Sequence, residues 1–526
     1  MPSPASKVSW KAKPSPAAQF QSGPRIPRSR RLLSAIAALM LAILALAGCA
    51  GMQNVSPPPG SPIPGENTTV TIQTSATAND QLSRFAIVIT SITLTNKAGK
   101  TVTLFNNSNP TQSVEAVHLN AKTEPFLTVS IPQDIYTSAA VTVGNCNFST
   151  VSILSGGLDF ATYDEGLCGE GTGNTTVILA SPLTISGTAM TLSFDLQVSH
   201  SFTLEGSISA GNDVYTIDPV FNLTASAISP QPTNDFNGLV SGLDGEITSV
   251  SGTDGFILAT ATGAIFNVTV DSHTGFQGVT DFSSLAAGAF VELDGSLSAT
   301  PMAGNSPSPT AVSLLASRIS VANPNAIEVA IGPVVGVFGP SSPVPDPATI
   351  NSMPIQQQGA PPGIGFGFPF QYSGAAFQVS GQFTNIPSLP FSAVFSDSTM
   401  VSGQNVYITA NSLTFTGGQF SPAATITLLP QTIDGTVAAV SNSNGFAVYS
   451  AVLAPYDLFP TLTGQQNQSD VPSNPRAVIV YADTNTQMLT SAPFGVGSVV
   501  RFTGLIFNDN GTLRMDCNRI SNGVAE

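Results

Sequence analysis

The sequence predicts an all-β protein in which an N-terminal β-sandwich precedes three small β-barrel-like (OB-like) repeats. Only 9% of the residues are charged. Thr, Ser, Val, Gly and Phe abound and long Ala/Leu/Glu/Lys stretches are missing, which is typical of β-sheets with many turns. Short apolar–polar alternations run through the chain, and three blocks of sequence recur in the same order. The part from Cys49 onward has room for three or four domains of about 100–150 residues.

Residues 1–48 are expected to be a cleaved export signal. Several arginines between residues 25 and 31 precede Leu32–Ala47, an uninterrupted run of apolar or small residues. The run is shorter than the stretch of about 20 residues that crosses a bilayer, and its basic flank favours a signal peptide. An ordinary secretory signal and an uncleaved anchor stay open as alternatives.

The end of this run, Leu46-Ala47-Gly48-Cys49, resembles the lipobox of bacterial lipoproteins. The resemblance implies that Cys49 is lipidated and becomes the new N-terminus, with residues 49–67 as a proline-rich tether. Residue 50 is Ala rather than Asp, so the family rule gives no signal for retention in the inner membrane. We therefore expect a lipid-anchored envelope protein in the outer membrane, on its periplasmic face or on the cell surface.

The charge distribution argues against nucleic-acid binding. Residues 1–48 hold seven of the 16 basic residues and none of the 31 acidic ones. The exported part therefore carries 9 basic and 31 acidic residues, a net charge of −22. Nucleic acids would be repelled, because proteins bind them by neutralising phosphates with Lys and Arg. Anionic headgroups are disfavoured for the same reason, so we expect membrane attachment through acyl chains alone.

Residues 68–228 are predicted to form a β-sandwich of seven to nine strands. Strand-like runs include 85–89, 126–131 and 139–143, and turn residues such as those at 96–100 separate them. Residues 190–196 alternate apolar and polar side chains, as a half-buried antiparallel strand does. A sandwich is the natural solution for such strands at this length.

The remainder of the chain repeats itself. Asp244–Val250 matches Asp434–Val440, and after four residues Gly255–Leu258 matches Gly445–Val448. A second block, Gly288–Gly295, matches Gly497–Gly504, and the units end alike, with Ala316–Ile319 against Cys517–Ile520. Three blocks in one order predict repeated structural units, here residues 236–322 and 433–522.

A third, degenerate unit is expected between these two, over residues 327–430. Its second block would be Gly403–Ala410, and a proline- and glycine-rich insertion is expected at 340–369. At about 90–100 residues, each unit suits a closed barrel of five or six strands. The apolar loop Gly363–Phe370 is either a partner-contact patch or a segment buried across a barrel end.

The units 236–322 and 433–522 resemble the bacterial repeat called domain of unknown function 5666. They share its pattern of Gly-x-Val, then Gly-Phe, then Gly-x-x-Val-x-Val-x-Gly. The segment 68–228 is similar, more loosely, to domain of unknown function 4382, through the Val/Thr-rich stretch 87–92 and the segment 129–136. These resemblances imply an envelope lipoprotein built of β domains, and they supply no catalytic residues.

Three cysteines follow Cys49. Cys146 and Cys168 are expected to form a disulfide in an oxidising compartment, which would stabilise the fold by about 3 kcal/mol. No Cys-x-x-Cys motif is present, so neither a metal nor a redox site is indicated. Cys517 occupies the place of Ala316 in the first repeat, which predicts a buried thiol.

Signatures of catalysis are missing from the sequence. There is no Gly-x-Ser-x-Gly or His-Glu-x-x-His motif, and the histidines, at 118, 200 and 273, are far apart. Glu292 and Asp294 share a strand face by spacing, yet the last repeat has Arg501 and Thr503 there, so no catalytic pair is assigned. No cofactor is expected.

One acidic cluster is a weak candidate for calcium, which needs several oxygen ligands in one loop. It comprises Asp159, Asp164, Glu165 and Glu170 around Cys168. The cluster lacks the Asp-x-Asp-x-Asp-Gly spacing of a calcium loop, so an acidic solvated loop is the favoured interpretation.

These observations lead us to expect a non-enzymatic, lipid-tethered envelope protein that serves as a scaffold or binding surface. One alternative is an adhesin that binds glycan or calcium. A further alternative, which the sequence favours less, is an envelope glycan hydrolase that uses carboxylates such as Asp159 or Asp164. The choice between a protein and a glycan partner stays open.

Overall fold

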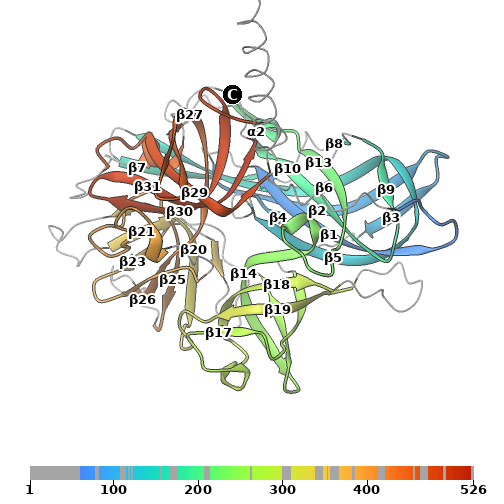
Figure 1. Cartoon of the computed structure of the whole chain (residues 1–526), viewed down its shortest axis with the longest axis horizontal. Coiled ribbons are helices and arrows are strands. Elements are labelled where there is room, and N and C mark those ends of the chain that lie inside the picture. The colour runs from blue at the N-terminus through green and yellow to red at the C-terminus, as the bar shows by residue number, and fades with distance from the viewer. Residues whose placement is uncertain are drawn as a thin grey trace, which may run out of the picture. The chain divides into compact units, whose positions relative to one another are not determined.

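The computed structural model of the chain describes residues 60–77, 82–106, 114–116, 119, 122–154, 157–165, 175–179, 181–205, 214–260, 264–298, 310–337, 347–351, 353–355, 367–381, 386–412, 421–453, 457–462, 472–489 and 493–522. Almost all of their regular structure is β-strand, which confirms the all-β fold class (Figure 1). The segment Asn54–Glu526 forms one compact unit. None of the helices in these ranges is long and apolar enough to cross a membrane.

The N-terminal strands form two sheets that enclose a common core. One sheet has five strands in the order β5-β1-β10-β13-β8; the other has six, β3-β2-β6-β7 with β4 and β9 beside them. The strands are β1 (Asn67–Thr77), β2 (Leu82–Asn96), β3 (Thr101–Asn106), β4 (Val114–Glu115), β5 (Thr123–Pro132), β6 (Asp134–Leu154), β7 (Gly157–Glu165), β8 (Thr176–Ile178), β9 (Leu183–Ile185), β10 (Ala189–Gln197) and β13 (Val220–Ala227). The number of strands in the two sheets exceeds the seven to nine predicted. The difference is due to β4, β8 and β9, which have only two or three residues each and were not expected from the sequence.

Strand β10 differs from the half-buried antiparallel strand that its alternation predicts. It pairs in parallel with β1 and antiparallel with β13. Its apolar face lies in the sandwich core, and its polar residues Thr191 and Ser193 are buried as well. Hydrogen bonds satisfy these hydroxyls, since Thr191 donates to the carbonyl of Phe236 and Ser193 to the side chain of Gln73. After β10 come α2 (Val198–Ser201) and the hairpin of β11 (Phe202–Glu205) and β12 (Val214–Ile217).

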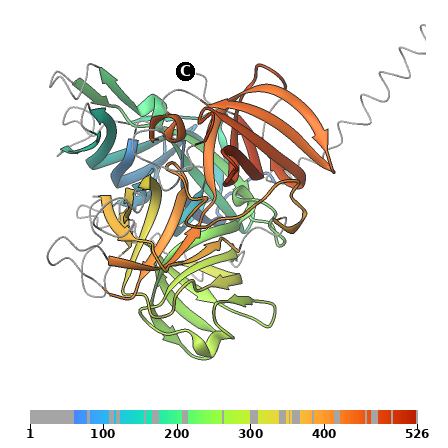
Figure 2. The same cartoon turned by 90° about the vertical axis from the view of Figure 1, so that its left-hand side faces the viewer.

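Three rings of five strands follow, which agrees with the predicted barrel-like repeats (Figures 1 and 2). Repeat 1 comprises β14 (Leu239–Ser251), β15 (Gly255–Ala259), β16 (Ile265–Thr269), β18 (Phe290–Leu297) and β19 (Val312–Ser320). Repeat 2 comprises β20 (Glu328–Val337), β21 (Pro347–Asn351), β23 (Gly367–Gln371), β25 (Asn405–Ala410) and β26 (Ser421–Leu428). Repeat 3 comprises β27 (Gln431–Ser443), β28 (Phe446–Leu453), β29 (Ala477–Met488), β30 (Val499–Asp509) and β31 (Thr512–Asn522).

All three rings have the same topology. If the strands of a ring are numbered along the chain, their order is 1-2-3-5-4, and strand 4 pairs again with strand 1. Strands 3 and 5 are parallel in each ring, and the other pairs are antiparallel. This arrangement is that of a small Greek-key barrel of the OB type.

A repeated turn brings the second block of each unit to the same place. Before strand 4, a glycine with positive φ donates its N–H to a carbonyl of strand 1, always at 2.8 Å. The three pairs are Gly288 with Ile247, Gly403 with Val334, and Gly497 with Val437. The φ values of 87°, 96° and 88° require glycine at this turn. Repeat 2 thus keeps the turn although its sequence is degenerate.

The expected insertion at 340–369 is in part ring structure. It contains β21, the short β22 (Met353–Ile355) and the start of β23. Prolines obscured these strands in the sequence. Pro347 begins β21, and Pro354 lies in β22 at the end of the sheet, which are positions where a missing N–H breaks no ladder. Of the apolar loop 363–370, Gly363 to Phe366 lie outside the described residues, and Phe370 is buried in the core of repeat 2.

Short elements complete the repeats. Strands β17 (Gly275–Gln277) and β24 (Ala376–Val379) each add in parallel to strand 5 of their ring. Helix α3 (Leu458–Leu462) places Phe459 in the core of repeat 3. Cys517 is buried in the same core, which confirms the predicted buried thiol.

Candidate functional site

The lipidation and disulfide predictions fall mainly outside the described residues. Cys49, Cys168 and Glu170 lie there. Cys146 is buried on β6 beside the sandwich core. Lipidation of Cys49 and pairing of Cys146 with Cys168 therefore stay predictions.

Three residues of the acidic cluster lie on a strand rather than in the loop that we expected. Asp159, Asp164 and Glu165 belong to β7, which pairs along its length with β6. At about 3.3 Å per residue, the backbones of Asp159 and Asp164 are about 16 Å apart. The acidic residues and the nearby glycines favoured a loop, but the aromatic residues Phe160 and Tyr163 between them are typical of a strand.

The histidines do not gather into a site. His118 lies outside the described residues, and His200 is exposed on α2. His273 is exposed in a turn beside Asp271. Across the described ranges, no group of three His, Cys, Asp or Glu side chains could hold a metal ion.

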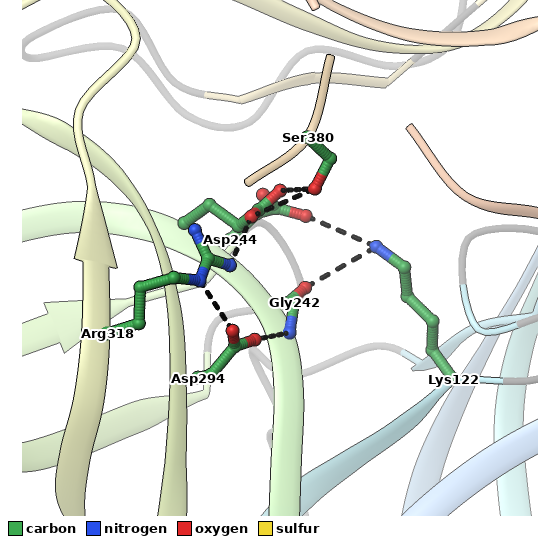
Figure 3. A network of polar contacts seen from close by, with 7 residues as sticks. Lys122, Gly242, Asp244, Asp294, Arg318 and Ser380 are labelled. Atoms are coloured by element: carbon green, nitrogen blue, oxygen red, sulfur yellow. Dashed lines mark hydrogen bonds and ion pairs between the residues drawn. The ribbon is translucent and has the colours of Figure 1, made fainter. Parts of the chain in front are cut away.

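Charged side chains instead converge where the β-sandwich, repeat 1 and repeat 2 meet. We call this group the junction cluster; it consists of Lys122, Asp244, Glu292, Asp294, Arg318 and Ser380 (Figure 3). Four members come from repeat 1, because β18 lies between β14 and β19 in its ring. The register places Asp244 opposite Glu292 and Asp294 opposite Arg318.

Arg318 binds both carboxylates of β18. Its Nε donates to Oδ2 of Asp294 and its Nη2 to Oε1 of Glu292, each at 2.6 Å. Asp294 also accepts a hydrogen bond of 2.8 Å from the N–H of Gly242, at a bulge in β14. These charge-assisted hydrogen bonds fix the two carboxylates on the face of the ring.

Two residues from other modules complete the junction cluster. Lys122, directly before β5 of the sandwich, places its Nζ 3.4 Å from Asp244 Oδ2 and from the carbonyl of Gly242. Ser380, directly after β24 of repeat 2, has its Oγ 3.2 and 3.3 Å from the two oxygens of Glu292. Segments more than 250 residues apart in the sequence thus meet on one face of repeat 1.

Burial makes these charges interact strongly. The exposed fraction of the side chain is 2% for Asp244, 9% for Glu292 and 13% for Arg318. Burial raises the pKa of Glu292, and the nearby Asp244 raises it further, whereas Arg318 lowers it. Burial alone would lower the pKa of Lys122, but Asp244, Glu292 and Glu124 together raise it.

Two polar atoms of the cluster lack hydrogen-bond partners among the described residues. They are Oδ1 of Asp244 and Nη1 of Arg318, and both are buried. Gly381 explains how repeat 2 comes so close, because a Cβ there would lie 3.1 Å from Nη1 of Arg318 and 2.0 Å from Oε1 of Gln277. The arrangement can hold three modules together and can take up a proton.

The same ring positions carry different charges in the other repeats. Glu292 corresponds to Tyr407 in repeat 2 and to Arg501 in repeat 3. Asp244 corresponds to Ile331 in repeat 2 and to Asp434 in repeat 3, and Arg318 corresponds to Arg519 in repeat 3. In repeat 3, Arg501 lies 3.5 Å from Asp434, and Arg519 binds Asp235 at 2.5 Å. Asp235 precedes β14, so this face of repeat 3 also contacts another part of the chain.

Sequence reasoning placed Glu292 and Asp294 on one strand face but did not find their partners. Arg318 and Asp244 were visible as members of repeated blocks. A charged residue inside a strand of so weakly charged a chain is a signal that could have identified them. Nothing in the sequence marks Lys122 or Ser380, since only the packing of separate modules brings them to repeat 1.

No protein-family model matches the chain, and no curated protein matches it. The resemblances to domains of unknown function 5666 and 4382 therefore stay predictions. The shared ring order and the repeated glycine turn establish the internal repeat independently of any relative.

Proposed function

We propose that the protein is an exported lipoprotein, anchored through Cys49, that acts as a non-catalytic scaffold or binding surface of the cell envelope. The Leu-Ala-Gly-Cys sequence after a basic and apolar leader carries this proposal. The net charge of −22 after residue 48 favours attachment through acyl chains over attachment through a basic surface.

The way the modules contact one another supports a scaffold role. The contacts between modules use the outer faces of strands 1 and 4, with Asp244 and Glu292 in repeat 1 and Ile331 and Tyr407 in repeat 2. In repeat 1, the outer residues of β16 and β19 stay exposed. An array joined in this manner presents other barrel faces to partners.

Lipidation is tested by expressing the full chain in a bacterium and following it with a clickable fatty acid. We expect the label in the membrane fraction for the unaltered chain and its loss in Cys49→Ser. Cys517→Ser, which changes a buried thiol elsewhere, should keep the label. Equal labelling or equal membrane association of Cys49→Ser would refute the anchor.

A glycan-binding role is the second candidate, favoured by the outer face of β16 and β19. Exposed hydroxyl and amide side chains lie there, including Asn267, Thr269, Ser313 and Ser317. In OB-type barrels, the neighbouring face of strands 2 and 3 can bind oligosaccharides. The residues at hand lack an aromatic platform, so the scaffold remains our first proposal.

A thermal-unfolding screen of the segment from Asn54 to Glu526 separates the two roles. Envelope glycans, calcium and EDTA would be added in turn, with calorimetry or a dye as the readout, because Trp10 is the only tryptophan. A ligand at about 100 times its Kd adds about 2.7 kcal/mol to the module that binds it. A shift with one class supports a binding module of that class; no shift supports the scaffold.

A further inference from the structure

The junction cluster holds more carboxylates than cations. Asp244, Glu292 and Asp294 face only Arg318 and Lys122. Arg318 is shared between Glu292 and Asp294, and Lys122 approaches Asp244 only to 3.4 Å. One negative charge is left over in a region that is nearly closed to water, where uncompensated charge is costly.

The excess charge is concentrated on Asp244 and Glu292. They are directly opposite on antiparallel strands, where Cβ atoms are about 4.5–5.5 Å apart and like charges destabilise the pair. Oδ1 of Asp244 is buried without a hydrogen-bond partner among the described residues. The titratable and charged groups around Glu292 are Asp244 of β14, Asp294 of β18, Arg318 of β19, Lys122 before β5 and Tyr407 of β25, with Glu124 of β5 close to Lys122.

We propose that the junction cluster is a proton-operated clamp, in which uptake of one proton by Glu292, held opposite Asp244, tightens the contact between the β-sandwich, repeat 1 and repeat 2. The proton lowers the number of charged carboxylates of repeat 1 that face Arg318 and Lys122 from three to two, and it removes the repulsion between Asp244 and Glu292. It also supplies an O–H donor to a pair that otherwise has only acceptors.

The pKa of Glu292 is shifted in the direction that such a clamp requires. Burial, and then Asp244, raise it above its ordinary value of 4.5. A carboxyl group with a raised pKa binds more protons in the folded than in the unfolded chain. Its contribution to stability is complete below its unfolded pKa and is lost as the pH rises through the folded pKa. The clamp therefore tightens on acidification and loosens toward alkaline pH.

Hydrogen exchange of the segment Asn54–Glu526 between pH 5 and pH 8 tests the clamp. After correction for intrinsic rates, we expect the protection of β14 and β18 to rise as the pH falls. One linked proton allows a change of up to about tenfold per pH unit. Glu292→Gln should remove most of this pH dependence; a smaller dependence remains, because burial also raises the pKa of Glu246 of β14. Glu66→Gln, which removes an exposed carboxylate, should keep the dependence of the unaltered chain.

Two outcomes overturn the proposal. One is a protection of β14 and β18 that does not change with pH in the unaltered chain. The other is a Glu292→Gln variant that keeps the pH dependence. If Glu292→Gln does not fold, Asp244→Asn removes the charge opposite Glu292. It should weaken the pH dependence, because Asp244 is the second cause of the raised pKa of Glu292, and a pH dependence equal to that of the unaltered chain would overturn the clamp.

Discussion

Asp516 shows how strongly the place of a residue in a barrel changes its chemistry. It is 1% exposed on β31, and its Oδ2 has no hydrogen-bond partner among the described residues. The corresponding residue of repeat 1, Leu315, is 41% exposed. Repeat 3 thus buries an acid where repeat 1 exposes a leucine. Burial, and next the neighbouring Asp483, raise the pKa of Asp516 to about 7.

This raised pKa makes repeat 3 sensitive to pH. The contribution of Asp516 is complete below its unfolded pKa of 3.8 and is lost as the pH rises through about 7. The loss amounts to about 4 kcal/mol. Calorimetry between pH 4 and pH 8 should show that Asp516→Asn loses much less stability than the unaltered chain over this range. Asp254→Asn, at an exposed turn, should follow the unaltered chain, and identical slopes for all three would contradict the assignment.

The residues that could be predicted are those whose pattern is local. The spacing of Glu292 and Asp294 gave their common face, and the position of Cys517 in a repeat gave its burial. Lys122 could not be predicted, because its role depends on how a loop of the sandwich packs against repeat 1. Single-sequence patterns describe one element at a time, whereas a charge network depends on the packing of several.

At the scale of elements, a bulge in strand 5, opposite strand 4, explains the last glycine of the second block. The pairing of strands 4 and 5 shifts in register at Gly295 in repeat 1 and at Gly504 in repeat 3. A Cβ on Gly504 would lie 2.0 Å from the carbonyl oxygen of Asp516, and one on Gly295 would lie 2.5 Å from that of Leu315. The glycine allows two backbones to approach closely as the ring curves.

Replacing Gly504 by Ala should therefore destabilise repeat 3. Backbone atoms would have to move, which costs about 1–3 kcal/mol for overpacking of this kind. Denaturant unfolding of the segment Asn54–Glu526 measures the loss. Gly495→Ala is the matched control, since no atom lies within 4 Å of the added Cβ. Equal midpoints for the two variants would show that the bulge tolerates a side chain.

The strands that were not predicted show no clear alternation of apolar and polar residues in the sequence. In repeat 2, prolines within the strands of 347–355 mask the alternation that reveals a strand. In the sandwich, β4, β8 and β9 are too short to show a period. By contrast, the longer strands β2, β5 and β6 contain the runs 85–89, 126–131 and 139–143, which could be recognised as strands from the sequence.

At the scale of the whole molecule, repeats 2 and 3 share a core. Leu505 and Phe507 of β30 pack into the core of repeat 2, while Phe502 and Ile506 of the same strand belong to repeat 3. The buried Gln404 of repeat 2 reinforces the contact, because its Nε2 donates a hydrogen bond of 2.9 Å to the carbonyl of Ile506. Two modules that share a strand in this way should unfold together.

Phe507→Ala tests this coupling. Removing a fully buried aromatic ring costs about 3–5 kcal/mol. We expect calorimetry to show one transition for repeats 2 and 3 that shifts as a unit, with Val496→Ala, at a side chain that is 69% exposed, leaving it in place. Hydrogen exchange assigns the transition to its strands. A loss of protection confined to repeat 3 would show that the two barrels unfold independently.

The closed rings affect how neighbouring molecules interact at a crowded surface. A strand at the edge of an open sheet can recruit a strand of another molecule, which is a common route to aggregation. In each ring, every strand has a partner on both sides, and strand 4 pairs again with strand 1. Molecules tethered side by side by a lipid, as we propose, would meet at high density. The closed rings give neighbouring molecules few unpaired strands to exchange, which confines this risk to the open edges of the β-sandwich and to short added strands such as β17 and β22.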